Sequence, residues 1–144
     1  MKANFIPEGF HTVTPYLLTK GADKIIEFVK RVFDAEEISR MDNADGTIMH
    51  AQVRIGDSMV MLSDARPEYP AMPGMLYLYV ENVDAVYDRA IKAGGVSLRE
   101  PTDEDYGDRS CGVQDVGGNQ WWIATHQEDV SPEGAERRMK EHTK

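Results

Sequence analysis

The chain has 144 residues, of which 41% are hydrophobic and 28% are charged, and its formal net charge at pH 7 is -9. This length suits one compact domain, and no apolar run approaches the roughly 18 residues of a membrane-spanning helix. The acidic balance argues against binding to nucleic acid, whose phosphates require a basic surface, and against binding to anionic membranes.

The N-terminal segment MKANFIPEGF lacks the apolar core of a signal peptide. We therefore expect a soluble, cytoplasmic protein. The single cysteine, Cys111, fits a reducing compartment and excludes both an internal disulfide and a zinc site built from several cysteines.

Residues 11–64 are predicted to form a strand, a helix and three strands. HTVTPYLL alternates apolar with polar residues as a strand does, and ADKIIEFVKRVF carries an apolar stripe at helical spacing. AEEISRMD is a short strand before the turn NADG. TIMHAQVRI and SMVMLSD then form a hairpin around the tight turn GD.

Residues 75–126 repeat this order after the proline-rich linker ARPEYPAMPG. MLYLYVEN is a strand, VDAVYDRAIKA is a helix, and VSLREP, DRSCGVQDV and NQWWIATH are strands. An ungapped alignment of the halves, offset by 61 residues, pairs Tyr16 with Tyr77 and His50 with Cys111. Two copies at this long period indicate a duplicated module rather than a repeat array.

The C-terminal segment is predicted to form a short helix over about residues 131–142, because Ser131 suits an N-cap and Pro132 the first helical position. Its charges indicate a solvated face. Docking of this helix onto a partner subunit is the alternative.

Strand alternation separates two faces of the predicted sheets. The apolar set, expected beneath the helices, is Val13, Leu17, Ala51, Val53, Ile55, Val60, Leu62, Leu76, Leu78, Val80, Trp121 and Ile123. The opposite, mixed set is Thr12, Thr14, Tyr16, His50, Gln52, Arg54, Met59, Met61, Ser63, Met75, Tyr77, Tyr79, Cys111, Gln120 and Trp122. A sheet face with so many aromatic and methionine side chains is unfavourable in water, and a small-molecule cleft is one way to shield it. A subunit interface or a second core packed with methionine is the alternative.

The motifs VTPYLL, IMHAQVRIGDSMVMLSDA, LYLYVENVDAV and YGDRSCGVQDVGGNQWWIATH resemble the vicinal oxygen chelate superfamily, which includes glyoxalase I, bleomycin-resistance proteins and extradiol dioxygenases. Within it they look like the PhnB-like branch. The resemblance covers nearly the whole chain. It implies an α+β fold in a single domain, residues 1–144, in which two tandem βαβββ modules form open half-barrel sheets around a cleft. It also implies a homodimer that completes its clefts across the subunit pair.

In metal-dependent members of this superfamily, the first and last strands of each module supply the metal ligands. Carried over, these positions fall on Thr14, Met61, Met75 and Trp122. Hydroxyl, thioether and indole groups do not suit a hard divalent cation. We therefore expect no metal and no other cofactor, and without a Lewis acid a glyoxalase reaction loses its usual route.

The leading hypothesis is a metal-free protein that, like bleomycin-resistance proteins, binds an aromatic or amphiphilic small molecule in an aromatic-lined cleft. The predicted ligand-binding residues are Tyr16, His50, Gln52, Met61, Tyr77, Tyr79, Tyr106, Arg109 and Trp122. The enzymatic alternative is a lyase, isomerase or dioxygenase of the glyoxalase type, using a noncanonical metal site or His50 as a base. A third possibility is an interaction module without a ligand.

Three further features leave alternatives open. His50 and Cys111 occupy equivalent positions of the duplication, so a Cys–His nucleophile is one hypothesis, although no local motif supports it. Arg109 is interpreted either as a ligand for a carboxylate or phosphonate, with Tyr106 closing the cleft, or as half of an Asp108–Arg109 clasp that shapes the turn. His11 and His126 are predicted to be surface histidines.

Overall fold

The computed structural model of the protein describes residues 2–143. The chain forms two compact units. The first comprises the chain up to Gly74 together with Asp115–Asn119, and the second comprises Met75–Gln114 and the chain from Gln120 onward. Each unit carries one four-stranded sheet.

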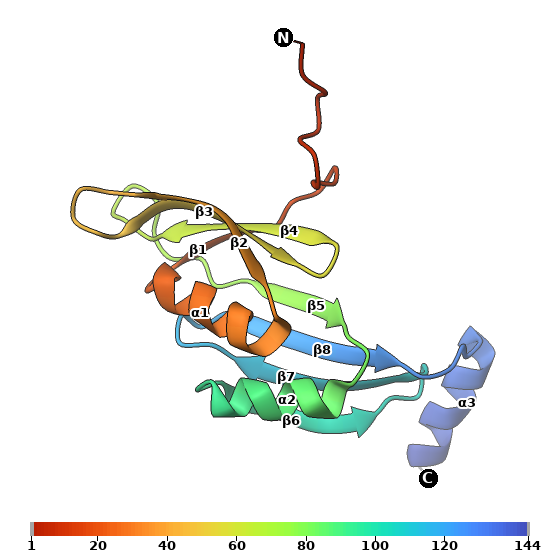
Figure 1. The fold of residues 1–144 in the computed structure, drawn as a ribbon. Coiled ribbons are helices and arrows are strands. Elements are labelled where there is room, and N and C mark those ends of the chain that lie inside the picture. The colour runs from red at the N-terminus through yellow and green to blue at the C-terminus, as the bar shows by residue number, and fades with distance from the viewer. Residues whose placement is uncertain (1, 144) are drawn as a thin grey trace. The chain divides into compact units, whose positions relative to one another are not determined.

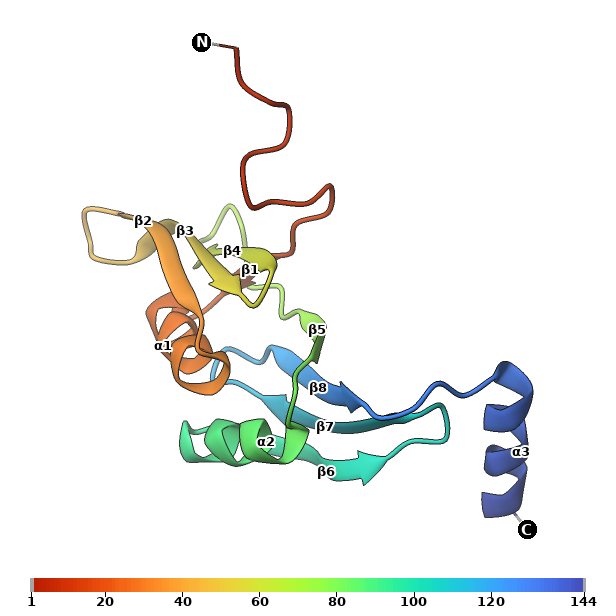
Figure 2. The same ribbon diagram turned by 45° about the vertical axis from the view of Figure 1, so that its right-hand side comes forward.

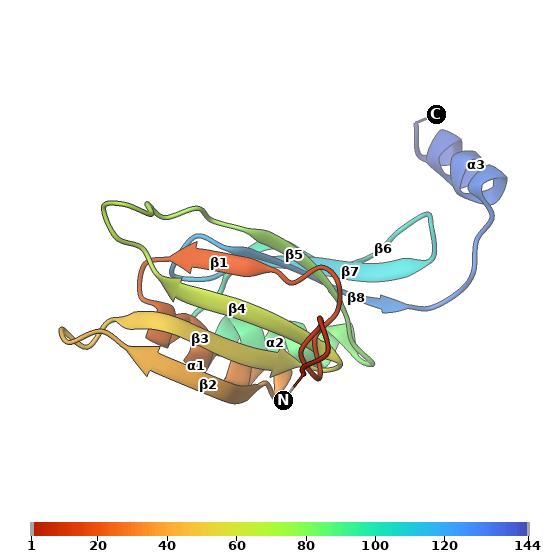
Figure 3. The same cartoon turned by 90° about the horizontal axis from the view of Figure 1, so that it is seen from above.

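The first sheet has the strand order β1-β4-β3-β2. Its strands are β1 (Tyr16–Thr19), β2 (Glu36–Asp42), β3 (Ile48–Ile55) and β4 (Ser58–Asp64). β1 runs parallel to β4, whereas the other neighbours are antiparallel. Helix α1 (Ala22–Phe33) lies against one face of this sheet, as Figures 1 and 3 show.

Helix α1 forms because its apolar residues recur on one side, where Ile25, Ile26 and Val29 are buried. Gly21 precedes the helix and has no side chain to cap it. Asp64 at the end of β4 compensates, because its Oδ1 accepts a hydrogen bond from the backbone N of Ala22 at 3.0 Å. The carboxylate also suits the positive end of the helix dipole. One acidic residue thereby ties the helix to its sheet.

The second sheet repeats this topology in the order β5-β8-β7-β6. Its strands are β5 (Met75–Tyr79), β6 (Val96–Asp103), β7 (Asp108–Gln114) and β8 (Gln120–His126). β5 is parallel to β8, and helix α2 (Val83–Lys92) packs on β6, β7 and β8 (Figure 2). The side chain of Asn82 caps α2 by accepting a hydrogen bond from the backbone N of Ala85 at 3.2 Å.

Helix α3 (Pro132–His142) follows the second sheet and extends beyond its end (Figure 2). The predicted N-cap is confirmed, since the Oγ of Ser131 accepts a hydrogen bond from the backbone N of Gly134 at 3.0 Å. None of the residues of α3 is buried. The helix is therefore held by its cap and by polar contacts rather than by an apolar core.

The predicted α+β fold of two tandem βαβββ modules is confirmed, and neither sheet closes into a barrel. Within residues 2–143, no helix is both long enough and apolar enough to cross a membrane.

The two predicted sheet faces are largely confirmed. Trp121 is 1% exposed, and Leu17, Leu62 and Ile123 are also buried in the helix-covered cores. Val13 is an error in this assignment, because it is 82% exposed. β1 begins only at Tyr16, so Val13 lies in the segment before the sheet rather than beneath a helix.

Cys111 is a second error in the face assignment, because it is buried opposite Ile123 on the helix-covered side of β7. The ungapped alignment fails at the second hairpin. Four residues, 55–58, separate the paired Arg54 and Met59, whereas five residues, 115–119, separate the equivalent Gln114 and Gln120. One extra residue reverses every side chain of the strand that precedes it. The structural equivalent of Cys111 is therefore Ala51, and the predicted equivalence with His50 is wrong.

Candidate functional site

The predicted ligand-binding residues divide into separate groups, one for each sheet. In the first unit, strand register brings Tyr16 of β1 and Gln52 of β3 opposite Met61 of β4. His50 lies two residues from Gln52 on the same face of β3. These four side chains therefore lie together on the sheet face opposite helix α1, as alternation predicted.

A short hydrogen-bonded chain links three of these residues. The amide nitrogen of Gln52 lies 3.2 Å from Nε2 of His50, and the hydroxyl of Tyr16 lies 3.3 Å from Nδ1 of His50. Because an amide N–H only donates, Nε2 accepts, and the imidazole proton resides on Nδ1. Tyr16 then accepts that proton and keeps its own hydroxyl hydrogen free. The one lone pair of neutral His50 is occupied, so action as a base requires Gln52 to move away.

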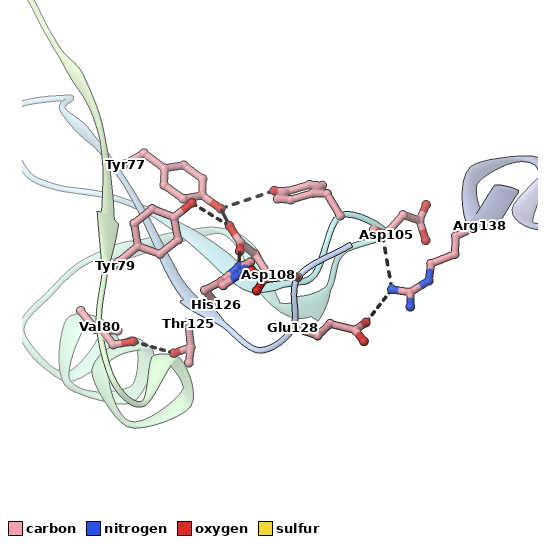
Figure 4. Close-up of polar contacts among 11 residues, drawn as sticks. Tyr77, Tyr79, Val80, Asp105, Asp108, Thr125, His126, Glu128 and Arg138 are labelled. Atoms are coloured by element: carbon pink, nitrogen blue, oxygen red, sulfur yellow. Dashed lines mark hydrogen bonds and ion pairs between the residues drawn. The ribbon is translucent and has the colours of Figure 1, made fainter. Parts of the chain in front are cut away.

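In the second unit, tyrosine hydroxyls gather on a buried carboxylate. Tyr77 and Tyr79 of β5 donate hydrogen bonds to Oδ2 of Asp108, at 2.9 and 3.1 Å (Figure 4). The hydroxyl of Tyr106 lies 3.4 Å from that of Tyr77. Asp108, the first residue of β7, is 2% exposed, whereas Tyr77 is 42% and Tyr79 is 65% exposed. The carboxylate thus anchors the hydroxyl ends of two tyrosines whose rings remain accessible.

His126 at the end of β8 completes this cluster. Its Nδ1 lies 2.8 Å from Oδ1 of Asp108, and its Nε2 lies 2.7 Å from Oδ1 of Asp129 (Figure 4 shows the contact with Asp108). Carboxylates only accept, so both ring nitrogens must carry protons. The hydrogen bonds that His126 donates to Asp129 and Asp108 accordingly raise the pKa of His126. His126 is half-exposed, as predicted, but it is also an imidazolium bridge between two acids.

The charges of the cluster support one another. Burial acts to raise the pKa of Asp108, but hydrogen bonds from His126, Tyr77 and Tyr79 outweigh burial and lower that pKa below its ordinary value. Burial, aided by hydrogen bonds with Tyr106 and Asp108, raises the pKa of Tyr77, and burial together with Asp108 raises that of Tyr79. These shifts favour an anionic aspartate, a cationic histidine and neutral phenols in the cluster.

Trp122 lies on the same face of the second sheet, opposite Tyr77 of β5 and Gly112 of β7. A Cβ atom at Gly112 would lie only 2.8 Å from Cζ3 and Cη2 of the indole. The ring therefore covers the backbone of Gly112, and its Nε1 donates to Oε1 of Gln120 at 3.0 Å. Trp122 is half-buried, with its ring orientation fixed by the strand beneath it.

Arg109 lies on the other side of β7, paired with Thr125 on the helix-covered face. Its Nε and Nη2 donate to the two carboxylate oxygens of Asp84 in α2, both at 3.0 Å, and its Nη1 lies 3.3 Å from Asp103. The predicted clasp between Asp108 and Arg109 is therefore wrong, because Arg109 binds Asp84 and Asp103 instead. The hydrogen bonds that this guanidinium donates to Asp84 and Asp103 raise its pKa. Arg109 fastens α2 to the sheet and points away from Tyr77.

The positions carried over from metal-dependent relatives are divided between the two units, with two positions in each. Thr14 precedes β1 and Met61 lies on β4, whereas Met75 lies on β5 and Trp122 on the neighbouring β8. Across residues 2–143, no three His, Cys, Asp or Glu side chains are grouped in a way that could hold a metal ion.

The thiol of Cys111 does not fit a nucleophile. Burial, reinforced by the negative charge of Asp84, raises its pKa to about 11. A thiol with this pKa is almost entirely protonated at neutral pH, and the thiolate is the reactive form.

A pocket of about 690 Å³ opens in the first unit. Of the predicted ligand-binding residues, Tyr16 lines this pocket, whereas His50, Gln52 and Met61 do not. Alternation of the strands did not predict the pocket, because loop residues form much of its wall.

The cluster around Asp108 was also missed by sequence reasoning, although a signal was present. Asp108 shares the parity of Gly112 along β7 and therefore faces the same side as Trp122. The alignment error that reversed β7 concealed this placement.

Comparisons with known proteins agree with the fold. Residues 9–123 match the family model described as Glyoxalase/Bleomycin resistance protein/Dioxygenase superfamily. An uncharacterized protein of Mycobacterium bovis, Mb0911c, is 30% identical over 138 residues, which cover 88% of this chain and 91% of that protein.

Two solved structures share the fold at lower identity. TnmS3, an antibiotic binding protein from Streptomyces sp. CB03234, superposes with a TM-score of 0.65 and 20% identity, covering 81% of this chain and 96% of TnmS3. A PhnB protein from Bacillus cereus, named a putative 3-demethylubiquinone-9 3-methyltransferase, has a TM-score of 0.64 and 19% identity, covering 80% of this chain and 99% of that one.

Proposed function

The chain belongs to the Glyoxalase/Bleomycin resistance protein/Dioxygenase superfamily, and we propose that it binds a small aromatic or amphiphilic molecule without a metal. The ligand lies against the aromatic face of the second sheet, formed by Tyr77, Tyr79 and Trp122. Within the superfamily we place the chain in the PhnB-like branch, because of the strand and loop motifs that resemble it.

The observation that carries this proposal is the rigidity of exposed aromatic rings. Tyr77 and Tyr79 keep accessible rings while their hydroxyls are tied to Asp108. Trp122 is fixed above Gly112. Aromatic groups held in place lose little conformational entropy when a flat ligand stacks on them, and each stacked pair contributes about 0.5–1.5 kcal/mol beyond buried area.

The fold of an antibiotic binding protein, TnmS3, supports small-molecule binding as a function that this architecture performs. The charge of the chain favours a particular kind of probe. With a net charge of -9, the protein attracts flat cations more than flat anions.

The proposal is tested with acridine orange, a flat cationic dye, followed by fluorescence anisotropy. We expect saturable binding that weakens about tenfold in Tyr79→Ala and in Trp122→Leu, the size of one lost aromatic contact. Phe5→Ala, which removes an exposed ring from the segment before β1, is the matched control and should bind as the wild type does. Equal affinities for all of these proteins would refute binding on this face.

The homodimer belongs to the same proposal, together with a cytoplasmic location. Tyr79 is 65% exposed on the aromatic face, and Met75 is similarly accessible. A second copy of the chain would bury this apolar surface. Sedimentation velocity at micromolar concentration should show a dimer. A monomer at that concentration would leave the ligand site to a single chain.

A further inference from the structure

The pocket of about 690 Å³ lies at one end of the first sheet. Its walls come from β1, from the loop between β2 and β3 with the start of β3, and from the end of β4 with the loop that follows it. Figure 3 shows both loops extending from the same end of this sheet. The pocket contains neither Trp122 nor any tyrosine of the second sheet, and its volume is in the range of small-molecule sites.

Both walls of the pocket are held in place by hydrogen bonds. In the loop between β2 and β3, Asp45 accepts from the backbone N and the hydroxyl of Thr47 at 3.0 and 2.6 Å, and the amide of Asn43 donates to the same hydroxyl at 2.9 Å. On the other wall, Asp64 accepts from the backbone N of Ala22 and of Ile48 at 3.0 and 2.7 Å. The cavity is therefore preformed and requires little ordering when a ligand enters.

Ser63 is the residue that points to a ligand. It is 6% exposed and lines the pocket, and no other residue between 2 and 143 forms a hydrogen bond with its hydroxyl. Every buried side-chain oxygen among residues 2–143 has a hydrogen-bond partner, so the unbonded hydroxyl of Ser63 is accessible from the pocket. A hydroxyl that lines a pocket and has no protein partner can form its hydrogen bonds with a molecule that occupies the pocket.

Tyr16 supplies a second group of the same kind. It lines the pocket, and its oxygen accepts the Nδ1 proton of His50 in the chain that begins at Gln52. Its own hydroxyl hydrogen is consequently available to donate. Ser63 and Tyr16 therefore present two free O–H donors to the cavity.

The charged residues of the lining already have partners within the protein. Asp45 and Asp64 are bonded within their walls, and Arg66 lies 3.8 Å from Glu68 with its guanidinium 5.0 Å from the centre of the Tyr69 ring. With three acidic residues and one arginine, the lining is negative, which disfavours an anion. Leu18, Ile48 and the ring of Tyr69 supply apolar surface.

We propose that this pocket is a second binding site, which takes an uncharged aromatic molecule carrying a carbonyl oxygen. The ring lies among the apolar side chains of the lining, and the carbonyl accepts hydrogen bonds from the hydroxyls of Ser63 and Tyr16. The inference is independent of the aromatic face of the second sheet, since the two sites share no residue.

The test uses prodan, a neutral naphthyl ketone whose emission shifts to the blue in an apolar, water-excluded site. Ser63→Ala and Tyr16→Phe each remove one hydroxyl and should each weaken prodan binding about fivefold, as expected for one neutral hydrogen bond. The matched controls are Ser58→Ala, at the exposed start of β4, and Tyr87→Phe, whose hydroxyl bonds to Ser97 in the second unit. Both controls should retain wild-type affinity.

A third variant, Ala65→Phe, fills the pocket from its own lining and should abolish prodan binding while Trp122→Leu leaves it unchanged. Three results would overturn the proposal: no saturable binding of prodan, affinities that respond to Trp122→Leu but to none of the three pocket variants, or equal affinity for the anionic naphthalene dye ANS. Failure here with intact binding of acridine orange would remove this site alone and leave the proposed function standing.

Discussion

The indole of Trp122 lies across the backbone of Gly112, on the neighbouring strand, at a distance that leaves no room for a β-carbon. Gly112 therefore determines how close this ring lies to the sheet, and Asp108 on the same strand holds the hydroxyls of Tyr77 and Tyr79. One face of β7 thus positions all three aromatic residues proposed to bind the ligand.

Gly112→Ala is predicted to destabilise the protein by about 1–3 kcal/mol, the usual cost of an overpacked contact. The added methyl group would lie 2.8 Å from the indole and must displace it. Urea unfolding of the single variants and of Gly112→Ala with Trp122→Ala measures the coupling. When Trp122 is already alanine, Gly112→Ala should lower the free energy of unfolding very little. An equally large loss in both backgrounds would show that the strain comes from the backbone rather than from contact with the indole.

The two adjacent tryptophans should respond differently to truncation. Trp121→Ala removes a ring that is buried in the helix-covered core and should cost about 3–5 kcal/mol in the free energy of unfolding. Trp122→Ala removes a half-buried ring and should cost clearly less while it weakens acridine orange binding. Chemical denaturation of both variants measures the two losses of stability. Equal losses would contradict the assignment of Trp121 and Trp122 to opposite faces of the sheet.

Sequence reasoning succeeded where periodicity alone determines structure. Alternation placed Trp121 in the core and Tyr77 on the other face, and the helical stripe of α1 was found, because these signals depend on local spacing. Cys111 was reversed because the number of residues in a hairpin turn sets strand register and is not visible in apolar spacing.

Side-chain partners were less accessible to sequence reasoning than strand faces. The pairing of Arg109 with Asp84 joins residues 25 positions apart, and it depends on where α2 crosses the sheet. The bridge from Asp108 through His126 to Asp129 depends on how the chain turns after β8. Tertiary geometry of this kind leaves no periodic signal in a single sequence.

The His126 bridge predicts that stability falls as pH rises through the folded-state pKa of this histidine. The folded-state pKa of His126 is raised above its ordinary value of 6.5, so the bridge contributes fully below that value and is lost as pH rises through the folded pKa. Urea midpoints measured between about pH 6 and pH 9 should decline in the wild type. They should decline less in His126→Gln.

The control for this experiment is His11→Gln, since His11 lies in the exposed segment before β1. That variant should follow the wild-type curve across the whole range. Proton NMR of the His126 ring gives a second measurement, in which Asp129→Asn should lower the pKa by removing one of the two carboxylates. A pKa at or below 6.5 in the wild type would contradict the bridge.

The attachment of helix α3 is predicted to be weak and sensitive to salt. No residue of the helix is buried, and among residues 2–143 three polar contacts hold it to the loops at the end of the second sheet. Arg138 donates to Glu128 at 2.6 Å and to the backbone oxygen of Asp105 at 3.3 Å, and His142 lies 2.8 Å from the Asp105 carboxylate. Exposed ion pairs contribute about 0–1 kcal/mol and are screened by salt.

Hydrogen exchange should therefore be faster in α3 than in α1, and the rate in α3 should rise further between about 0.05 M and about 0.5 M salt. Arg138→Ala should reproduce the effect of salt at low ionic strength, because it removes two of the three contacts. Arg137→Ala, a neighbouring arginine on the same helix, is the control. Exchange in α3 as slow as in α1 at both salt concentrations would mean that an apolar surface covers this helix, and in a protein that sediments as a dimer that surface would belong to the second copy.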